Sequence, residues 1–265
     1  MHTRTNPPHL TPNDSMRGPD VEAVSPRVAA RLAGVSYLAM FVLAIVANFV
    51  VRERLIAPGD AAATATNIGE SIGLFRIGLL AFLGIFVLDV AIAWTLHVVF
   101  RGVSRDLSLV AAWFRVVYSA LLGVGLAALF NVAQLVDGTS FAFLDSGQVQ
   151  VQTMVALSFF EMVWLVGLVS FGIHLVLLGI LVMRSGLVTK VLGYVLAAAG
   201  VAYVADTVAH GVMPDYDTVA GVFLVVVAIP SIVGEGWLGL WLVGTHSIRG
   251  RFEGSEGRRV VHGGH

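Results

Sequence analysis

Ionisable side chains that interrupt long apolar stretches are the residues of this chain whose types allow chemistry. One group of them lies at a similar depth on four different stretches, counted at 1.5 Å per residue along a helix. It consists of Asp89, Arg115, His174 and Glu235, with Ser231 one turn before Glu235 on the same helical face. A charged side chain at mid-membrane costs roughly 2.5–3.5 kcal/mol on insertion scales. The group therefore predicts either a functional polar site or interhelical ion pairs.

A second polar group lies nearer the opposite ends of the same stretches. Its members are Arg76, Glu161, Asp206 and His210. Asp206 and His210 are four residues apart and share a helical face, as two metal ligands would, but no third ligand accompanies them. We therefore predict no metal site, no cofactor and no catalytic residue.

The buried charges do not balance, because two arginines face four carboxyl groups. We expect Arg115 to pair with Glu235 or Asp89, and Arg76 to pair with Asp206. Two acids then remain, and burial disfavours their ionised forms. They are expected to be protonated or to meet water.

Pro230 marks a local anomaly in the last apolar stretch. Proline cannot donate to the carbonyl of Val226, and Gly234 and Gly236 flank Glu235 one turn later. The pattern is typical of a proline kink in an inert span. The alternative is a broken helix around a buried carboxyl group, as transporters use for an ion or substrate site.

The amino-acid composition indicates that these apolar stretches are surrounded by lipid and not by water. Of 265 residues, 57% are hydrophobic and 12% are charged, against about 25% charged in soluble domains. Too few charges are available to cover a soluble surface, so a soluble enzyme, a disordered regulator and a nucleic-acid binder are excluded. The net charge of -1 and the absence of cysteine exclude a strongly basic surface, disulfides and thiolate metal sites.

Six stretches reach the roughly 20 apolar residues that a membrane-spanning helix needs. They cover residues 32–51, 74–100, 107–136, 155–183, 188–213 and 218–244. Their apolar runs are continuous and do not alternate as barrel strands do. The predicted fold is an all-α, polytopic six-transmembrane-helix bundle. In the first connection, Asp60 is expected to cap a short surface helix.

The distribution of Lys and Arg predicts the orientation. Basic residues concentrate in both tails and in the second and fourth connections. The positive-inside rule then places the N and C termini in the cytoplasm. We expect a disordered cytoplasmic tail over residues 1–30, a membrane domain over 31–246 and a flexible tail over 247–265. The arginines of that last tail are expected to contact anionic lipids.

Several short segments in order along the chain resemble a known membrane family. They include residues 58–64 (PGDAAAT), 73–76 (GLFR), 172–174 (GIH) and 234–235 (GE), with Asp89 and Asp206 between them. The chain resembles the bacterial six-helix family called domain of unknown function 4386. This resemblance implies a prokaryotic inner-membrane protein with six helices, and it supplies no activity.

The sequence is compatible with three functions. The first is a non-catalytic protein of the bacterial inner membrane with a structural, sensing or envelope role, in which ion pairs join the helices. The alternative is a small-solute or proton-coupled transporter that uses the layer of buried charges. An intramembrane lipid-modifying enzyme is the least favoured, because neither a Gly-x-Ser-Gly nucleophile nor three zinc ligands are evident. The partner common to all three is the lipid bilayer.

Overall fold

The computed structural model describes residues 24–244, and the described chain is helical throughout its regular elements. The elements are α1 (Pro26–Ile45), η1 (Val46–Arg52), α2 (Glu53–Leu55), α3 (Ala61–Glu70), α4 (Ile72–Phe100), α5 (Arg105–Asp137), α6 (Ser146–Ser185), α7 (Lys190–Val212), η2 (Tyr216–Thr218) and α8 (Ala220–Gly244). Six helical segments within these residues are long and apolar enough to span a membrane, the first being Pro26–Leu55. The predicted all-α, six-helix membrane bundle is confirmed.

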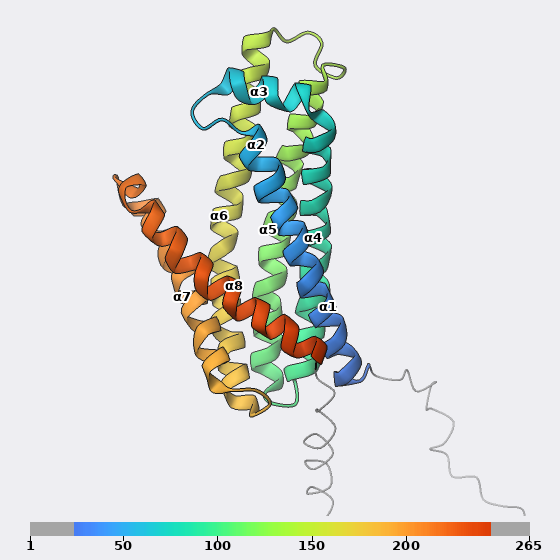
Figure 1. Ribbon diagram of the computed structural model, residues 1–265, viewed down its shortest axis with the longest axis vertical. Helices are drawn as coiled ribbons and strands as arrows, with labels where there is room; N and C mark the ends of the chain where they lie inside the picture. The colour runs from blue at the N-terminus through green and yellow to red at the C-terminus, as the bar shows by residue number, and fades with distance from the viewer. Residues whose placement is uncertain (1–23, 245–265) are drawn as a thin grey trace, which may run out of the picture.

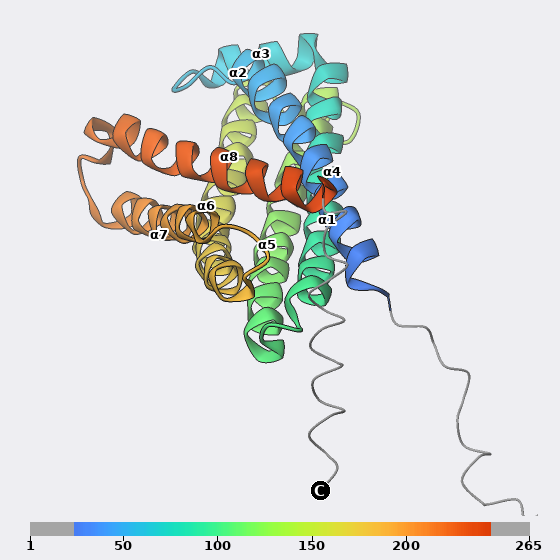
Figure 2. The same ribbon diagram turned by 60° about the horizontal axis from the view of Figure 1, so that its bottom comes forward.

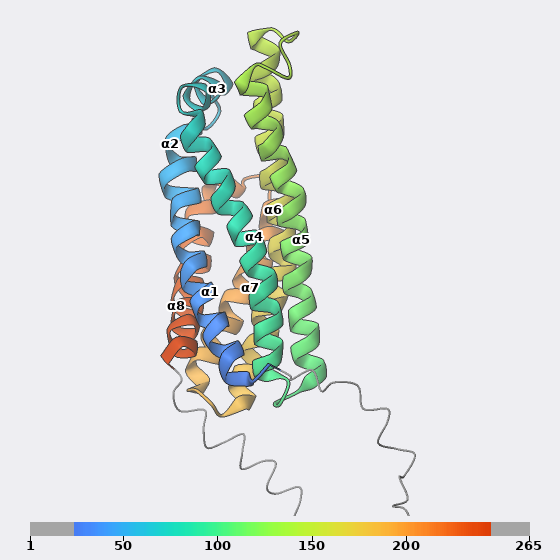
Figure 3. The ribbon, with the colours of Figure 1, turned by 90° about the vertical axis from the view of Figure 1, so that its right-hand side faces the viewer.

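The helices form two groups in space. The segments α1, α4, α5 and α6 run side by side along the long axis of the molecule (Figures 1 and 3). The last two helices, α7 and α8, lie together and lean away from this axis toward one end (Figures 1 and 2). This arrangement spreads the helices at the end of the bundle that carries α3 and η2, whereas the helices stay close at the opposite end (Figure 1).

Local capping residues fix the ends of the helices. Ser104 caps α5, and Asp145 forms a capping box with Gln148 at the start of α6. Gly138 and Gly186 end these two helices with φ of 70° and 62°, which glycine adopts without steric cost.

The first helix begins earlier than residue 31. Ser25 is its N-cap and Pro26 takes the first helical position, where a missing N–H costs nothing. The predictions for residues 1–23 and 245–265, including lipid contacts of the C-terminal arginines, lie outside the described residues.

The connection between the first two spans contains the expected surface helix. Oδ1 of Asp60 accepts a hydrogen bond of 2.8 Å from the amide of Ala63 at the start of α3. Before this connection the first span changes from α-helix to the π-helix η1. Such widened turns occur frequently at functional sites.

The last span is not broken at Pro230. Helix α8 continues from Ala220 to Gly244 with Pro230 inside it. One residue later, the Ser231 hydroxyl donates to the carbonyl of Val227 at 2.7 Å. The proline thus removes one backbone hydrogen bond without ending the helix.

Glycines bring α6 and α7 into close contact. A Cβ added to Gly172 would lie 2.6 Å from the carbonyl oxygen of Gly200, and one added to Gly179 would lie 2.5 Å from that of Gly193. Small residues at such positions allow membrane helices to approach closely. A similar contact holds α8 to α1, because a Cβ on Gly34 would lie 2.7 Å from the backbone nitrogen of Val243.

These contacts predict a contrast between two glycine substitutions in α7. We expect Gly200→Ala to destabilise the protein by about 1–3 kcal/mol, because the new methyl group meets backbone atoms of α6. The control is Gly211→Ala, where a Cβ meets nothing within 4 Å. It should leave stability unchanged or raise it, since alanine favours the helix. Thermal unfolding in detergent measures both. Equal effects of the two variants would contradict the close packing of α6 against α7.

Candidate functional site

Arg115 on α5 is a fully buried charge, with an exposed fraction of 0%. Its Nε lies 2.9 Å and its Nη2 2.6 Å from Oδ1 of Asp89 on α4. Nη1 donates to the Tyr37 hydroxyl of α1 at 2.9 Å, and Nη2 lies 3.6 Å from the sulfur of Met40. The guanidinium therefore joins three helices and has its hydrogen-bond partners inside the protein, as a buried charge requires.

His174 brings α6 into the same network. Its Nε2 lies 3.2 Å from Nη1 of Arg115, and its Nδ1 lies 2.8 Å from the carbonyl oxygen of Ala111. A carbonyl only accepts and a guanidinium only donates, so the ring is a neutral imidazole with its proton on Nδ1. The rings of Tyr37 and Phe171 lie 5.0 and 5.3 Å from Cζ of Arg115 and add cation–π contacts. We call Tyr37, Asp89, Arg115 and His174 the inner cluster.

Glu235 on α8 is the buried acid without a partner at this site. Its exposed fraction is 6%, and Oε2 has no hydrogen-bond partner within residues 24–244. No ion pair joins it to a basic side chain of those residues. Oδ2 of Asp89 is likewise without a hydrogen bond there, because both nitrogens of Arg115 contact Oδ1. With one guanidinium for two acids, one negative charge stays uncompensated whenever both are ionised.

Glu235, Asp89 and Ser231 line a cavity of about 350 Å³ between the six spans. This volume lies within the range of small-molecule sites, roughly 300–1,000 Å³. All six spans contribute to its walls, and its aromatic residues are Phe41, Phe82, Tyr118, Trp164, Phe171 and Tyr203. The cavity thus combines an apolar, aromatic wall with two acids, Asp89 and Glu235, that line it, which suits a ligand with an apolar part and a polar part.

Asp206 extends the cavity wall toward the C-terminal end of α7. The Tyr216 hydroxyl donates to its Oδ1 at 2.6 Å, and the His210 ring lies 4.5 Å from that of Tyr216. Burial, and then the hydrogen bond to Asp206, raises the pKa of Tyr216 to about 12. The hydroxyl therefore keeps its proton at neutral pH and can donate. No group of three potential metal ligands occurs in the described part of the chain.

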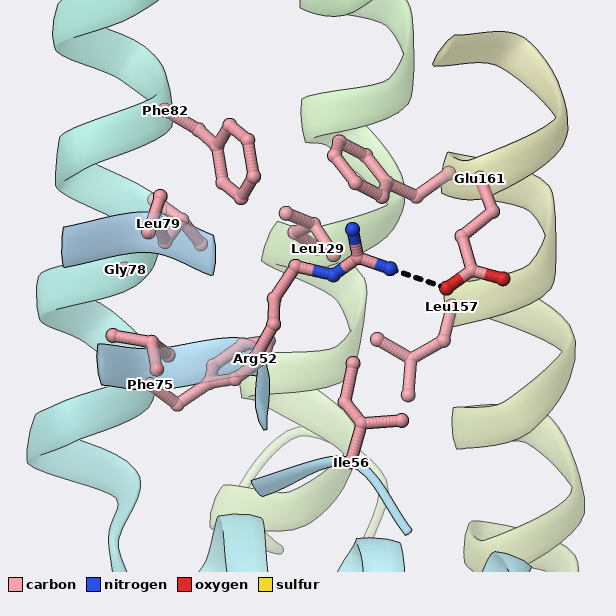
Figure 4. A pocket seen from close by; sticks show the side chains of 12 residues that line it. Arg52, Ile56, Phe75, Gly78, Leu79, Phe82, Leu129, Leu157 and Glu161 are labelled. Atoms are coloured by element: carbon pink, nitrogen blue, oxygen red, sulfur yellow. Dashed lines mark hydrogen bonds and ion pairs between the residues drawn. The ribbon is translucent and has the colours of Figure 1, made fainter. Parts of the chain in front are cut away.

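The second polar group is not a single layer. Glu161 on α6 forms an ion pair with Arg52 at the end of η1 (Figure 4). The guanidinium of Arg52 lies over Phe160 and Trp164, at 5.9 and 5.6 Å from their ring centroids. Arg52 crosses beside a small apolar pocket to reach this carboxylate (Figure 4). The ion pair therefore connects the π-helical turn to α6.

The expected pair of Arg76 and Asp206 is wrong. Nη2 of Arg76 lies 3.4 Å from Oδ2 of Asp137, and both side chains are largely exposed. Asp137 ends α5, which packs beside α4, whereas Asp206 lies on α7, which leans away. Equal depth in the membrane did not make these two residues neighbours.

Sequence reasoning identified the depth of the site but missed part of its composition. Five residues were predicted for this site, and all of them lie in the inner cluster or on the cavity wall: Asp89, Arg115, His174, Glu235 and Ser231. Sequence reasoning missed Tyr37, whose hydroxyl and ring both contact the guanidinium. The depth of an aromatic residue on the first span was the available signal.

Comparison with known proteins gives the family. Residues 32–244 match the family described as Domain of unknown function (DUF4386), so the chain belongs to this family. An uncharacterised protein of the archaeon Archaeoglobus fulgidus is 29% identical over 167 residues, which cover 63% of this chain and 80% of that protein. No solved structure matches the chain significantly.

The inner cluster predicts a large difference between two ion pairs. We expect Asp89→Asn to destabilise the protein by about 3–5 kcal/mol, because it leaves Arg115 buried without its counter-ion. Adding Arg115→Gln to it should cost less than the sum of the single changes. Denaturation in mixed micelles measures these free energies.

The exposed pair of Arg76 and Asp137 provides the control cycle. Its single substitutions to Gln and Asn should each change stability by about 0–1 kcal/mol. Additive effects of Asp89→Asn and Arg115→Gln, with no coupling between them, would contradict the arrangement of the inner cluster.

Proposed function

We propose that the protein is a non-catalytic, ligand-binding protein of the prokaryotic cytoplasmic membrane, with a sensing role and both termini in the cytoplasm. The observation that carries this proposal is Glu235, a buried carboxyl group with an unpartnered oxygen on the wall of a 350 Å³ cavity. In this assignment the inner cluster holds the helices, and Glu235 binds a proton or a ligand cation.

The different roles of Arg115 and Glu235 follow from their contacts. Arg115 is held by Asp89, Tyr37 and His174, so its replacement would disturb three other helices. The side chain of Glu235 makes no such connection within residues 24–244, so burying it brings no structural gain there. A buried carboxyl group without a structural partner is a functional hypothesis by default.

A second candidate is proton-coupled transport of a small solute. It is favoured by the extent of the cavity, which reaches from Glu235 to Asp206 nearer the outer end of α7. Two acids along one cavity provide successive positions for a proton or a cation. Both candidates share ligand binding at Glu235. Net movement of solute across a vesicle membrane distinguishes the carrier from the sensor.

Carbodiimide labelling tests the shared step. Diisopropylcarbodiimide, a small membrane-soluble reagent, adds to protonated carboxyl groups, and the modified peptide is identified by mass spectrometry. We expect modification of Glu235 in lipid nanodiscs, because this carboxyl group is unpaired and borders a cavity. Asp89 should stay unmodified, because Arg115 holds it as a carboxylate.

The Glu235→Gln variant should lose this label and keep the folded state, since the amide removes no contact that joins helices. Modification of Asp89 in place of Glu235, or of neither residue in the folded protein, would overturn the proposal.

A further inference from the structure

The charge of the cavity wall determines which ligands it can accept. Three acids line the cavity, namely Asp89, Asp206 and Glu235, and its described lining contains no Arg, Lys or His. Asp89 is neutralised by Arg115, whereas Asp206 accepts a hydrogen bond from the neutral Tyr216 and has no ion pair within residues 24–244. Glu235 is the buried acid that a ligand can neutralise, and Asp206 adds a second negative charge to the wall. An anionic ligand would meet uncompensated negative charge in an environment of low dielectric constant.

The aromatic residues add a second selection. Four aromatic residues from three helices line the cavity, namely Phe41, Trp164, Phe171 and Tyr203. Trp164 and Phe171 already contact the guanidinium groups of Arg52 and Arg115 on one face, whereas Phe41 and Tyr203 have no such contact in the described chain. The faces of such rings attract cations, by about 2 kcal/mol or more where water is excluded. Their area also stabilises an apolar ligand body. The acids and the aromatic side chains together favour an organic cation over a hydrated inorganic ion. A hydrated ion would make no apolar contact with the aromatic side chains.

The rim of the cavity borders the lipid-facing surface. Leu224 and Ile232 of α8 line the cavity and yet are 69% and 60% exposed. Across from them, α1 contributes Phe41 and Ala44. Helices α1 and α8 are in contact near Gly34 and Val243 and diverge from there (Figure 1). The opening is thus apolar and faces sideways between these helices.

We infer that the ligand is a lipophilic organic monocation, with a quaternary or protonated amine on an apolar body, that enters from the membrane between α1 and α8. This inference rests on the proposed function and specifies its ligand class. The ammonium group pairs with Glu235, and the apolar body occupies the aromatic part of the cavity. The cation and the proton then compete for one carboxylate.

A pair of isosteric probes tests this inference. Benzyltrimethylammonium carries a permanent positive charge, and neopentylbenzene has the same shape with carbon in place of nitrogen. We expect the cation to bind the full-length protein in nanodiscs and to protect Glu235 from diisopropylcarbodiimide. Glu235→Gln should weaken its binding by at least about tenfold, because the counter-ion is lost. The control Glu70→Gln changes an acid of α3 outside the cavity and should bind the cation as the unaltered protein does.

Ala228→Leu gives a second variant that removes no charge. Ala228 lines the cavity on α8, so a leucine there reduces the space and should weaken binding of the cation. Equal binding of the two probes, or equal cation binding by the unaltered protein and Glu235→Gln, would overturn the inference. Labelling of Glu235 without protection by the cation would leave the proposed function intact and reject the ligand class. Failure to label Glu235 in the folded protein would reject the proposed function itself.

Discussion

The ion pair between Arg115 and Asp89 is the interaction on which the rest of the structure depends. A guanidinium is not readily neutralised by deprotonation, so its burial between apolar helices requires partners from several directions. Asp89, Tyr37 and His174 supply them from three other helices. The N–H groups of Arg115 are directed at Asp89, Tyr37, His174 and Met40, so the guanidinium neutralises one carboxylate and has no N–H left for Glu235. The unpaired acid on the cavity wall is thus a consequence of how the bundle is held together.

Backbone packing sets the shape of the space around that acid. Glycine pairs hold α7 against α6, and Gly34 holds α1 against the C-terminal end of α8. Helix α8 is fixed to α1 at that end, and the α7–α8 pair leans outward (Figure 1). The cavity lies next to the inner cluster, which contributes Asp89 to its wall. The glycine contacts that hold the helices together at some positions therefore also leave the cavity between them at others.

Much of the fold could be predicted from the sequence, because span length, capping and depth depend on counting residues along one helix. The six spans, the cap at Asp60 and the shared depth of Asp89, Arg115 and His174 follow from such counts. Side-chain partners across helices could not be predicted in this way, since rotation and tilt depend on the packing of all helices. Arg76 therefore pairs with Asp137 on the neighbouring helix. Pro230 leaves α8 continuous, because neighbouring helices and side chains support a helix that lacks one hydrogen bond.

The central claim is that Glu235, and no group of the inner cluster, is the carboxyl group available to a proton or a ligand. Infrared difference spectroscopy of the protein in lipid tests it most directly, because a protonated carboxyl group has its own carbonyl stretching band. We expect a band that responds to a cationic ligand, that disappears in Glu235→Gln and that persists when the exposed Asp137 is changed to Asn. A band that survives in Glu235→Gln with the ligand response unchanged would show that another carboxyl group takes up the proton.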